Sequence, residues 1–204
     1  VFNNGGDDDK IIEISQWGPL TMSNQIRAFK GCSNLKLTST DALNLGSLNQ
    51  MRDFFYDCNS LDSGGNLNSW NVSDQGNSDA FRNCFSNCHI FNNGGSPSIS
   101  GWDTSNCIDP GGMFENARVF NQPIGSWDTS GFNNVGYMFQ QAYLFNQDLS
   151  NWDMSSATSM ARMFNNATGF NNAGATGIYN WDVSSCTNFA EIFNNADSFN
   201  QNIG

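Results

Sequence analysis

Residues 138–155 read MFQQAYLFNQDLSNWDMS, and the same pattern returns along most of the chain. Residues 113–130 read MFENARVFNQPIGSWDTS, and residues 163–172 read MFNNATGFNN before a further WDVS at residues 181–184. Each copy holds a Met-Phe pair, a Phe-Asn-Gln or Phe-Asn-Asn triplet and a Trp-Asp-x-Ser segment. Self-similarity with a period of about 20 to 50 residues is typical of proteins built from stacked repeats.

Two apolar positions that lie six residues apart define the register of the repeat. The first row is Phe29, Phe55, Phe85, Phe114, Phe139, Phe164 and Phe193. The second row is Leu35, Leu61, Phe91, Phe120, Phe145, Phe170 and Phe199. Three residues after each first Phe comes a small row: Cys32, Cys58, Cys88, Ala117, Ala142, Ala167 and Ala196. Because all seven copies keep these offsets, the sequence predicts seven stacked repeats.

The apolar spacing within one copy predicts a short helix followed by a short strand. Four side chains recur at i, i+3, i+4 and i+7, which is one face of a helix. In one copy they are Met160, Met163, Phe164 and Ala167. The Phe-Asn-Gln segment that follows has the spacing of a short extended strand, and the Trp-Asp-x-Ser segment is typical of a turn in which Asp bonds the backbone.

No copy can bury its own apolar face, so the copies must stack, pair their strands in parallel and build one continuous core. We therefore expect an α/β repeat fold: a leucine-rich-repeat-like solenoid of about seven coils, each a short parallel strand, turn and short helix. It would be a single domain over residues 1–204, with an entry segment and first coil at residues 1–28 and repeats at residues 29–204. Both ends fall inside motif-like stretches, so we expect a piece of a longer chain.

Charge and composition narrow the range of partners. The 204 residues include 19 acidic and 8 basic ones, for a net charge of −11. That charge repels phosphate backbones and anionic lipids, so we expect no nucleic acid partner and no docking on anionic membranes. The sequence has no run of about 18 apolar residues, so no membrane span is expected. The 17 Phe and 6 Trp predict an aromatic core, since a disordered segment is poor in such residues.

The repeat motif resembles that of a known family. The pattern of Trp-Asp-x-Ser, Met-Phe-x-x-Ala/Cys and Phe-Asn-Gln is similar to the BspA-like leucine-rich-repeat bacterial surface proteins, a repeat class that also occurs in mycoplasma and Listeria surface lipoproteins. Residues 11–18, IIEISQWG, resemble the entry segment of such arrays. The resemblance covers nearly the whole chain. It implies display outside a cell, with adhesion as the expected role, and it implies no enzymatic activity.

The aspartate of each Trp-Asp-x-Ser segment forms a row of candidate metal ligands: Asp103, Asp128, Asp153 and Asp182. One interpretation is local, since an Asp side chain can bond the backbone two residues on as an Asx-turn. The alternative is a bridging Ca²⁺, because stacked carboxylates repel one another unless they bond backbone amides or share a cation. No other cofactor is expected.

Repeat proteins commonly bind partners through an exposed face of the stack. We assign the polar positions beside the second apolar row to that face, namely Gln122, Gln147, Asp148 and Gln201. The Trp residues have two interpretations: a stacking platform for sugar rings, or packing at the core or its edge. We favour packing, because the family that the motif resembles often has Phe at this row, which needs no polar partner.

The six cysteines suggest a disulfide framework or a zinc site, but the repeat offers a third interpretation. Each Cys occupies a position where another copy has an apolar residue, so we expect buried free thiols. The Cys84-x-x-x-Cys88 spacing with His89 lacks the four ligands of a structural zinc site.

We therefore expect a non-enzymatic extracellular module that binds a protein or a polysaccharide at a cell surface. The alternative is a structural spacer or fibre subunit of a cell-surface or virion assembly, whose ends meet neighbouring subunits. A single His gives no Ser-His-Asp set. A glycan-directed enzyme would need a pocket that does not repeat, and the sequence shows none.

Overall fold

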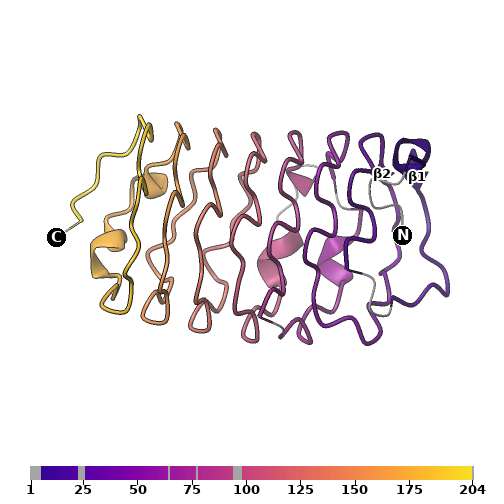
Figure 1. Cartoon of the computed structure of the whole chain (residues 1–204), viewed down its shortest axis with the longest axis horizontal. Helices are drawn as coiled ribbons and strands as arrows, with labels where there is room; N and C mark the ends of the chain where they lie inside the picture. The colour runs from indigo at the N-terminus through magenta and orange to yellow at the C-terminus, as the bar shows by residue number, and fades with distance from the viewer. Residues whose placement is uncertain (1–5, 23–25, 64, 77, 94–97, 204) are drawn as a thin grey trace.

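The computed structural model describes residues 6–22, 26–63, 65–76, 78–93 and 98–203. The molecule is elongated, with its termini at opposite ends and successive repeats side by side along the long axis (Figure 1). Rings of the first apolar row stack between neighbouring repeats from Phe29 to Phe193, with centroids 5.5 to 6.0 Å apart. Within one repeat, the rings of Phe114 and Phe120 stack at 3.8 Å. The predicted aromatic core is confirmed.

Regular secondary structure is sparse. Strands β1 (Glu13–Ile14) and β2 (Lys36–Leu37) form a two-stranded parallel sheet near the N-terminus. The elements with described bounds are otherwise 3-10 helices of three or four residues: η1 (Asp8–Lys10), η2 (Leu67–Ser69), η4 (Ser98–Gly101), η5 (Asn172–Gly174) and η6 (Gly177–Asn180). No helix in the described part of the chain is long and apolar enough to cross a bilayer.

The expected α/β fold, a leucine-rich-repeat-like solenoid of about seven coils with a strand and a short helix in each, is wrong. Over the described ranges the chain forms the β1–β2 pair, three isolated parallel bridges and short 3-10 helices, and no α-helix. Most of each repeat is a succession of turns instead.

Left-handed backbone explains why the predicted helix over residues 160–167 does not form. Arg162 and Asn166 both have φ of 57°, an angle that a right-handed helix of L-residues does not contain. The result is a ribbon of overlapping turns whose amides alternate in direction. The amide of Met163 donates to Met160 O within the repeat at 3.1 Å, whereas that of Arg162 donates to Ala190 O in the next repeat at 2.8 Å. A helix would turn every amide inward and remove this link between repeats.

The predicted strand at Phe-Asn-Gln is also absent, because side chains replace the strand ladder there. The amide of Asn146 donates to Asn121 Oδ1, and Asn146 Oδ1 in turn accepts from the amide of Asn171, both at 2.9 Å. From Asn92 onward, each repeat therefore bonds to the next through an Asn side chain. In the first copies a backbone carbonyl accepts at this position, and β2 lies there.

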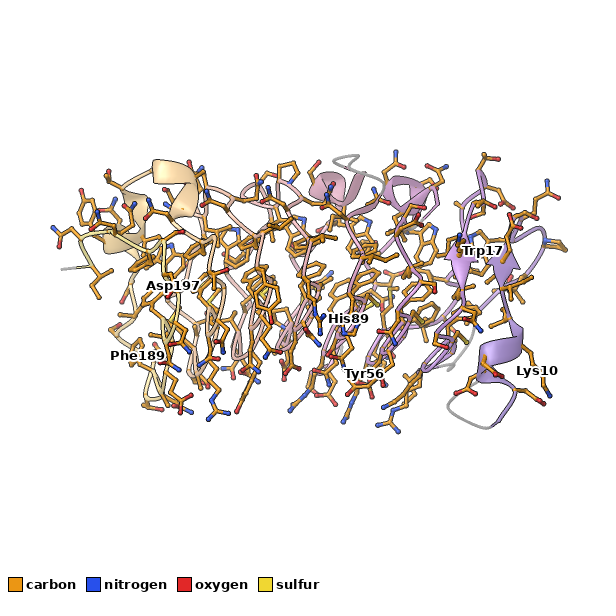
Figure 2. All side chains as sticks on the ribbon, turned by 90° about the horizontal axis from the view of Figure 1, so that it is seen from above. Lys10, Trp17, Tyr56, His89, Phe189 and Asp197 are labelled. Carbon is orange, nitrogen blue, oxygen red and sulfur yellow. The ribbon has the colours of Figure 1, made fainter. Side chains whose placement is uncertain are left out.

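One left-handed position recurs in every turn ribbon, two residues before the first Phe. We call these residues the left-handed row: Arg27, Asp53, Asn83, Gly112, Tyr137, Arg162 and Glu191. We call the part of the surface that carries this row the left-handed edge. Its charged side chains pair between neighbouring repeats, as Arg27 does with Asp53, and Tyr56, labelled in Figure 2, follows the first Phe of one of these turn ribbons. Any break in this row therefore changes the surface of that edge.

Candidate functional site

The aspartate row lies at the surface, and each carboxylate caps its own turn. Asp103, Asp128, Asp153 and Asp182 are exposed. In each, Oδ1 accepts from the amide of the Ser two residues on, at 2.9 to 3.1 Å. These Ser bonds lower the pKa of Asp103, Asp153 and Asp182 below its usual range. Among the described residues no three His, Cys, Asp or Glu side chains converge on a metal position. The geometry supports Asx-turn capping, and a bridging Ca²⁺ has no converging ligand set.

The predicted binding face consists largely of side chains that already have partners. Exposure was wrongly expected for Gln122, which is 2 % exposed and donates to Asn92 O at 2.8 Å. Gln147 and Gln201 are half-buried and bond the preceding repeat in the same way. Asp148 is exposed, but its Oδ1 accepts from the amide of Ser150 at 2.9 Å. A ligand role for these four residues stays a prediction, and the hydrogen bonds do not favour it.

The Trp and Cys rows belong to the core. The indole N–H of Trp127 donates to Ile99 O, and that of Trp152 donates to Ile124 O. Both side chains are buried, so they offer no platform to a sugar. All six cysteines are free thiols, and five are buried, with Cys186 half-buried. Burial raises the pKa of the Cys32 thiol to about 12.

Ion pairs between neighbouring repeats occupy much of the left-handed edge. Their closest N–O distances lie between 2.7 and 3.3 Å. They are Arg27–Asp53, Arg52–Asp79, Arg82–Asp109 and Arg162–Glu191. With Lys30, which lies 3.6 Å from Asp53, five of the eight basic residues of this acidic chain form ion pairs between repeats.

The edge is broken at Gly112, where a pocket of about 240 Å³ opens. We call this pocket the Gly112 notch; its lining residues are Arg82, Asn83, Gly111, Gly112, Glu115, Asn134, Gly136 and Tyr137. Gly112 has φ of 66°, and a Cβ on it would collide with the Asn83 side chain. A Cβ on Gly111 would lie 2.8 Å from Asp109 Oδ1. Glycine at these two positions therefore leaves room for the close approach of the Asn83 and Asp109 side chains.

Two carboxyl groups near the notch differ in how well their charge is compensated by neighbouring groups. Asp109 is 8 % exposed and fully partnered, since it accepts from the Gly111 amide at 2.8 Å and pairs with Arg82 at 3.3 Å. Glu115 is half-buried and has only two long contacts, from Ser86 Oγ and Gln140 Nε2, each at 3.4 Å. No Lys or Arg of the described residues forms an ion pair with it. Burial raises the pKa of both carboxyl groups.

The groups that the notch offers to a ligand are hydrogen-bonding side chains and one aromatic ring. Its lining residues include no Ser, Cys or His. It offers a carboxylate, two amides and the exposed ring of Tyr137, which is 41 % exposed. The repeat pattern alone did not indicate this site. One usable signal is present in the sequence: at the position three residues before the first Phe, two earlier copies have Arg52 and Arg82, and the copies at the notch have Gly111 and Gly136.

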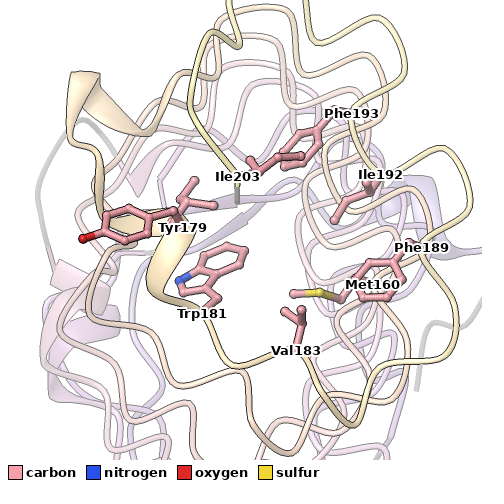
Figure 3. A pocket seen from close by; sticks show the side chains of 9 residues that line it. Met160, Tyr179, Trp181, Val183, Phe189, Ile192, Phe193 and Ile203 are labelled. Carbon is pink, nitrogen blue, oxygen red and sulfur yellow. The ribbon is translucent and has the colours of Figure 1, made fainter.

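A second, apolar pocket of about 290 Å³ lies at the C-terminal end of the molecule (Figure 3). We call it the end pocket; its lining residues are Met160, Ile178, Tyr179, Trp181, Val183, Phe189, Ile192, Phe193 and Ile203. Three nearby backbone amides, those of Glu191, Phe193 and Asn195, have no acceptor among the described residues. Their counterparts one repeat earlier donate to the following repeat. The end pocket and these N–H groups are therefore the same kinds of groups that join one repeat to the next inside the chain.

Comparison with known proteins gives one result. A family model described as "Mycoplasma protein of unknown function, DUF285" matches residues 2–96 and again residues 79–204. The two matches together span nearly the whole chain. No curated protein and no solved structure matches it.

Proposed function

The chain belongs to the DUF285 family, and from that membership and its surfaces we propose that it is a non-enzymatic binding module. It acts outside the cell, at a bacterial surface, in the manner of the BspA-like surface proteins that its motifs resemble. Its ligand is a protein or a polysaccharide. The family description supports a mycoplasma relationship, and the role in binding rests on the geometry of the edge.

The Gly112 notch is the observation that carries this proposal. Elsewhere along the edge, long side chains pair between repeats and close the surface. At the notch two glycines replace them and leave a pocket lined by hydrogen-bonding groups. A concave site with a few convergent polar groups is the usual form of a binding site.

The test is a binding screen of the whole chain against a glycan array and a panel of extracellular host proteins. One variant, Glu115→Lys, fills the notch with a side chain that the same position already carries as Lys30 in the first copy. The control, Asp148→Asn, changes an exposed carboxylate of the other candidate face. The proposal expects a ligand that Asp148→Asn retains and Glu115→Lys loses. A ligand bound equally by both variants contradicts the notch, and no ligand at all contradicts the function.

A structural spacer or fibre subunit is the second candidate, and the end pocket favours it. Tyr179 is 55 % and Ile203 is 59 % exposed, and the amides of Glu191, Phe193 and Asn195 have no acceptor in the part of the chain that the structure describes. More of the same chain or a neighbouring subunit, with Phe rings and a carbonyl row of its own, would supply both. Sedimentation equilibrium from low to high concentration tests this role: association that Ile203→Glu abolishes supports it, and a monomer at every concentration contradicts it.

A further inference from the structure

We propose that the Gly112 notch binds an organic ammonium group, such as a lysine side chain or an amino sugar. This inference rests on the proposed binding function and names the chemical class of the ligand. It follows from an unpaired carboxylate, from an aromatic ring beside it, and from an arrangement inside the same chain that already holds an ammonium group.

The unpaired carboxylate is Glu115. Other acidic side chains of the edge have basic partners: Asp53 has Arg27, and Glu191 has Arg162. Glu115 has none among the described residues, and its two donors lie at the outer limit of hydrogen bonding. A half-buried carboxylate without a cation is costly, and a bound cation would relieve that cost.

The first copies of the repeat show how this edge holds an ammonium group. Lys30 Nζ lies 3.6 Å from Asp53 Oδ2 and 4.3 Å from the ring centroid of Tyr56. The chain thus already places an ammonium between a carboxylate and a tyrosine ring. Glu115 and Tyr137 line the notch together. The guanidinium of Arg162 lies over the Tyr137 ring, 5.8 Å from its centroid, so this ring accepts a cation. Glu115, in contrast, forms an ion pair with no Lys or Arg of the described residues.

The remaining features favour an ammonium over other ligands. A Ca²⁺ ion takes six to eight oxygens at about 2.3 to 2.6 Å, and the described residues hold no such group of acids. An anion would meet Glu115, and Arg82 is already paired with Asp109. An ammonium donates hydrogen bonds, which the carboxylate can accept, and attracts an aromatic face. The net charge of −11 draws cations to the molecule.

The experiment is isothermal calorimetry on the whole chain with matched pairs of small probes. Nα-acetyl-lysine methylamide is compared with its norleucine analogue, which lacks the ammonium, and glucosamine is compared with glucose. We expect each ammonium probe to bind about tenfold more tightly than its neutral analogue, or better, as one charge-assisted contact requires. The pair with the larger difference distinguishes a protein lysine from an amino sugar as the source.

Three variants locate the binding. Glu115→Gln keeps the side chain's shape and should abolish the preference for ammonium probes. Tyr137→Asn, which places at this left-handed position the residue found at Asn83, should weaken both ammonium probes alike. Asp148→Asn removes an exposed carboxylate outside the notch, and should leave binding unchanged. Thermal melts check that each variant is folded.

Equal affinity for charged and neutral probes overturns the inference, as does ammonium binding that survives Glu115→Gln. Failure here is distinguishable from failure of the proposed function. If a macromolecular ligand is lost in Glu115→Lys but the ammonium probes bind no better than neutral ones, the binding module stands and the ammonium assignment is wrong.

Discussion

Replacement of Phe139 by Ala removes a ring from the middle of the stacked core. The side chain is completely buried and contacts four other rings. Its nearest partner is Phe145, with centroids 4.0 Å apart, and the other three lie 5.6 to 6.1 Å away. Truncation of a buried Phe to Ala costs about 3 to 5 kcal/mol, and each favourable ring pair contributes about 0.5 to 1.5 kcal/mol of specific stacking. Four partners place Phe139 near the upper end, at about 4 to 5 kcal/mol.

The matched substitution is Phe193→Ala in the same row at the C-terminal end. Phe193 is only partly buried and has two ring partners, Phe164 at 5.5 Å and Phe199 at 3.9 Å. Because Phe193 has half as many ring partners as Phe139, we expect Phe193→Ala to lower the free energy of unfolding by about 2 kcal/mol. Urea unfolding followed by Trp fluorescence measures both costs. For a chain of this length, Phe139→Ala should also lower Tm by about 10 to 15 °C.

A milder substitution controls for the general effect of any change in the core. Phe145→Leu places in the second row the residue that Leu35 and Leu61 provide there, and should cost under about 2 kcal/mol. The reasoning is refuted if Phe139→Ala costs no more than Phe193→Ala, because stacking between neighbouring repeats would then not determine stability.

Three further predictions follow from the hydrogen bonds and thiols. Asn146→Ala should lower the free energy of unfolding by about 1 to 2 kcal/mol, because Asn146 Oδ1 accepts hydrogen bonds from two backbone amides, at 2.8 and 2.9 Å. Asn200→Ala, at the end of the same row, should change it hardly at all. Equal losses in urea unfolding would contradict the role of the Asn row. A thiol reagent should label Cys186 readily and the other five cysteines only in denaturant, and rapid labelling of more than one native thiol would contradict their burial. Burial raises the pKa of Glu115, so the wild-type protein loses stability as the pH rises through that folded-state pKa. Glu115→Gln should therefore raise Tm at neutral pH and leave it unchanged well below pH of about 4. A difference in Tm that does not depend on pH would contradict this.

The sequence predicts which residues are buried better than it predicts the backbone. The i, i+3, i+4, i+7 spacing of residues 160–167 selects the core side chains correctly, because overlapping turns and a helix bring nearly the same positions to one face. It cannot distinguish the two, since the difference lies in the left-handed angles of Arg162 and Asn166. Arginine is not a residue that marks such an angle. The Asn side chains that replace the strand ladder are equally invisible to a pattern of apolar residues.

The candidate site was hidden for a related reason. Alignment of the copies draws attention to what recurs, and Gln122 and Gln147 recur because they bond one repeat to the next. The notch is a departure from the pattern: Gly111 and Gly112 stand where other copies have longer side chains. The unpaired state of Glu115 depends on distances to its neighbours, which sequence does not provide.

The central claim is that binding occurs at the Gly112 notch. NMR chemical-shift mapping of the isotope-labelled chain, titrated with Nα-acetyl-lysine methylamide, tests this claim most directly. The account predicts that the amide and side-chain shifts that move cluster at the Gly112 notch, around Asn83, Glu115 and Tyr137. Shifts centred on Gln147 and Asp148, or spread evenly along the stack, would contradict it.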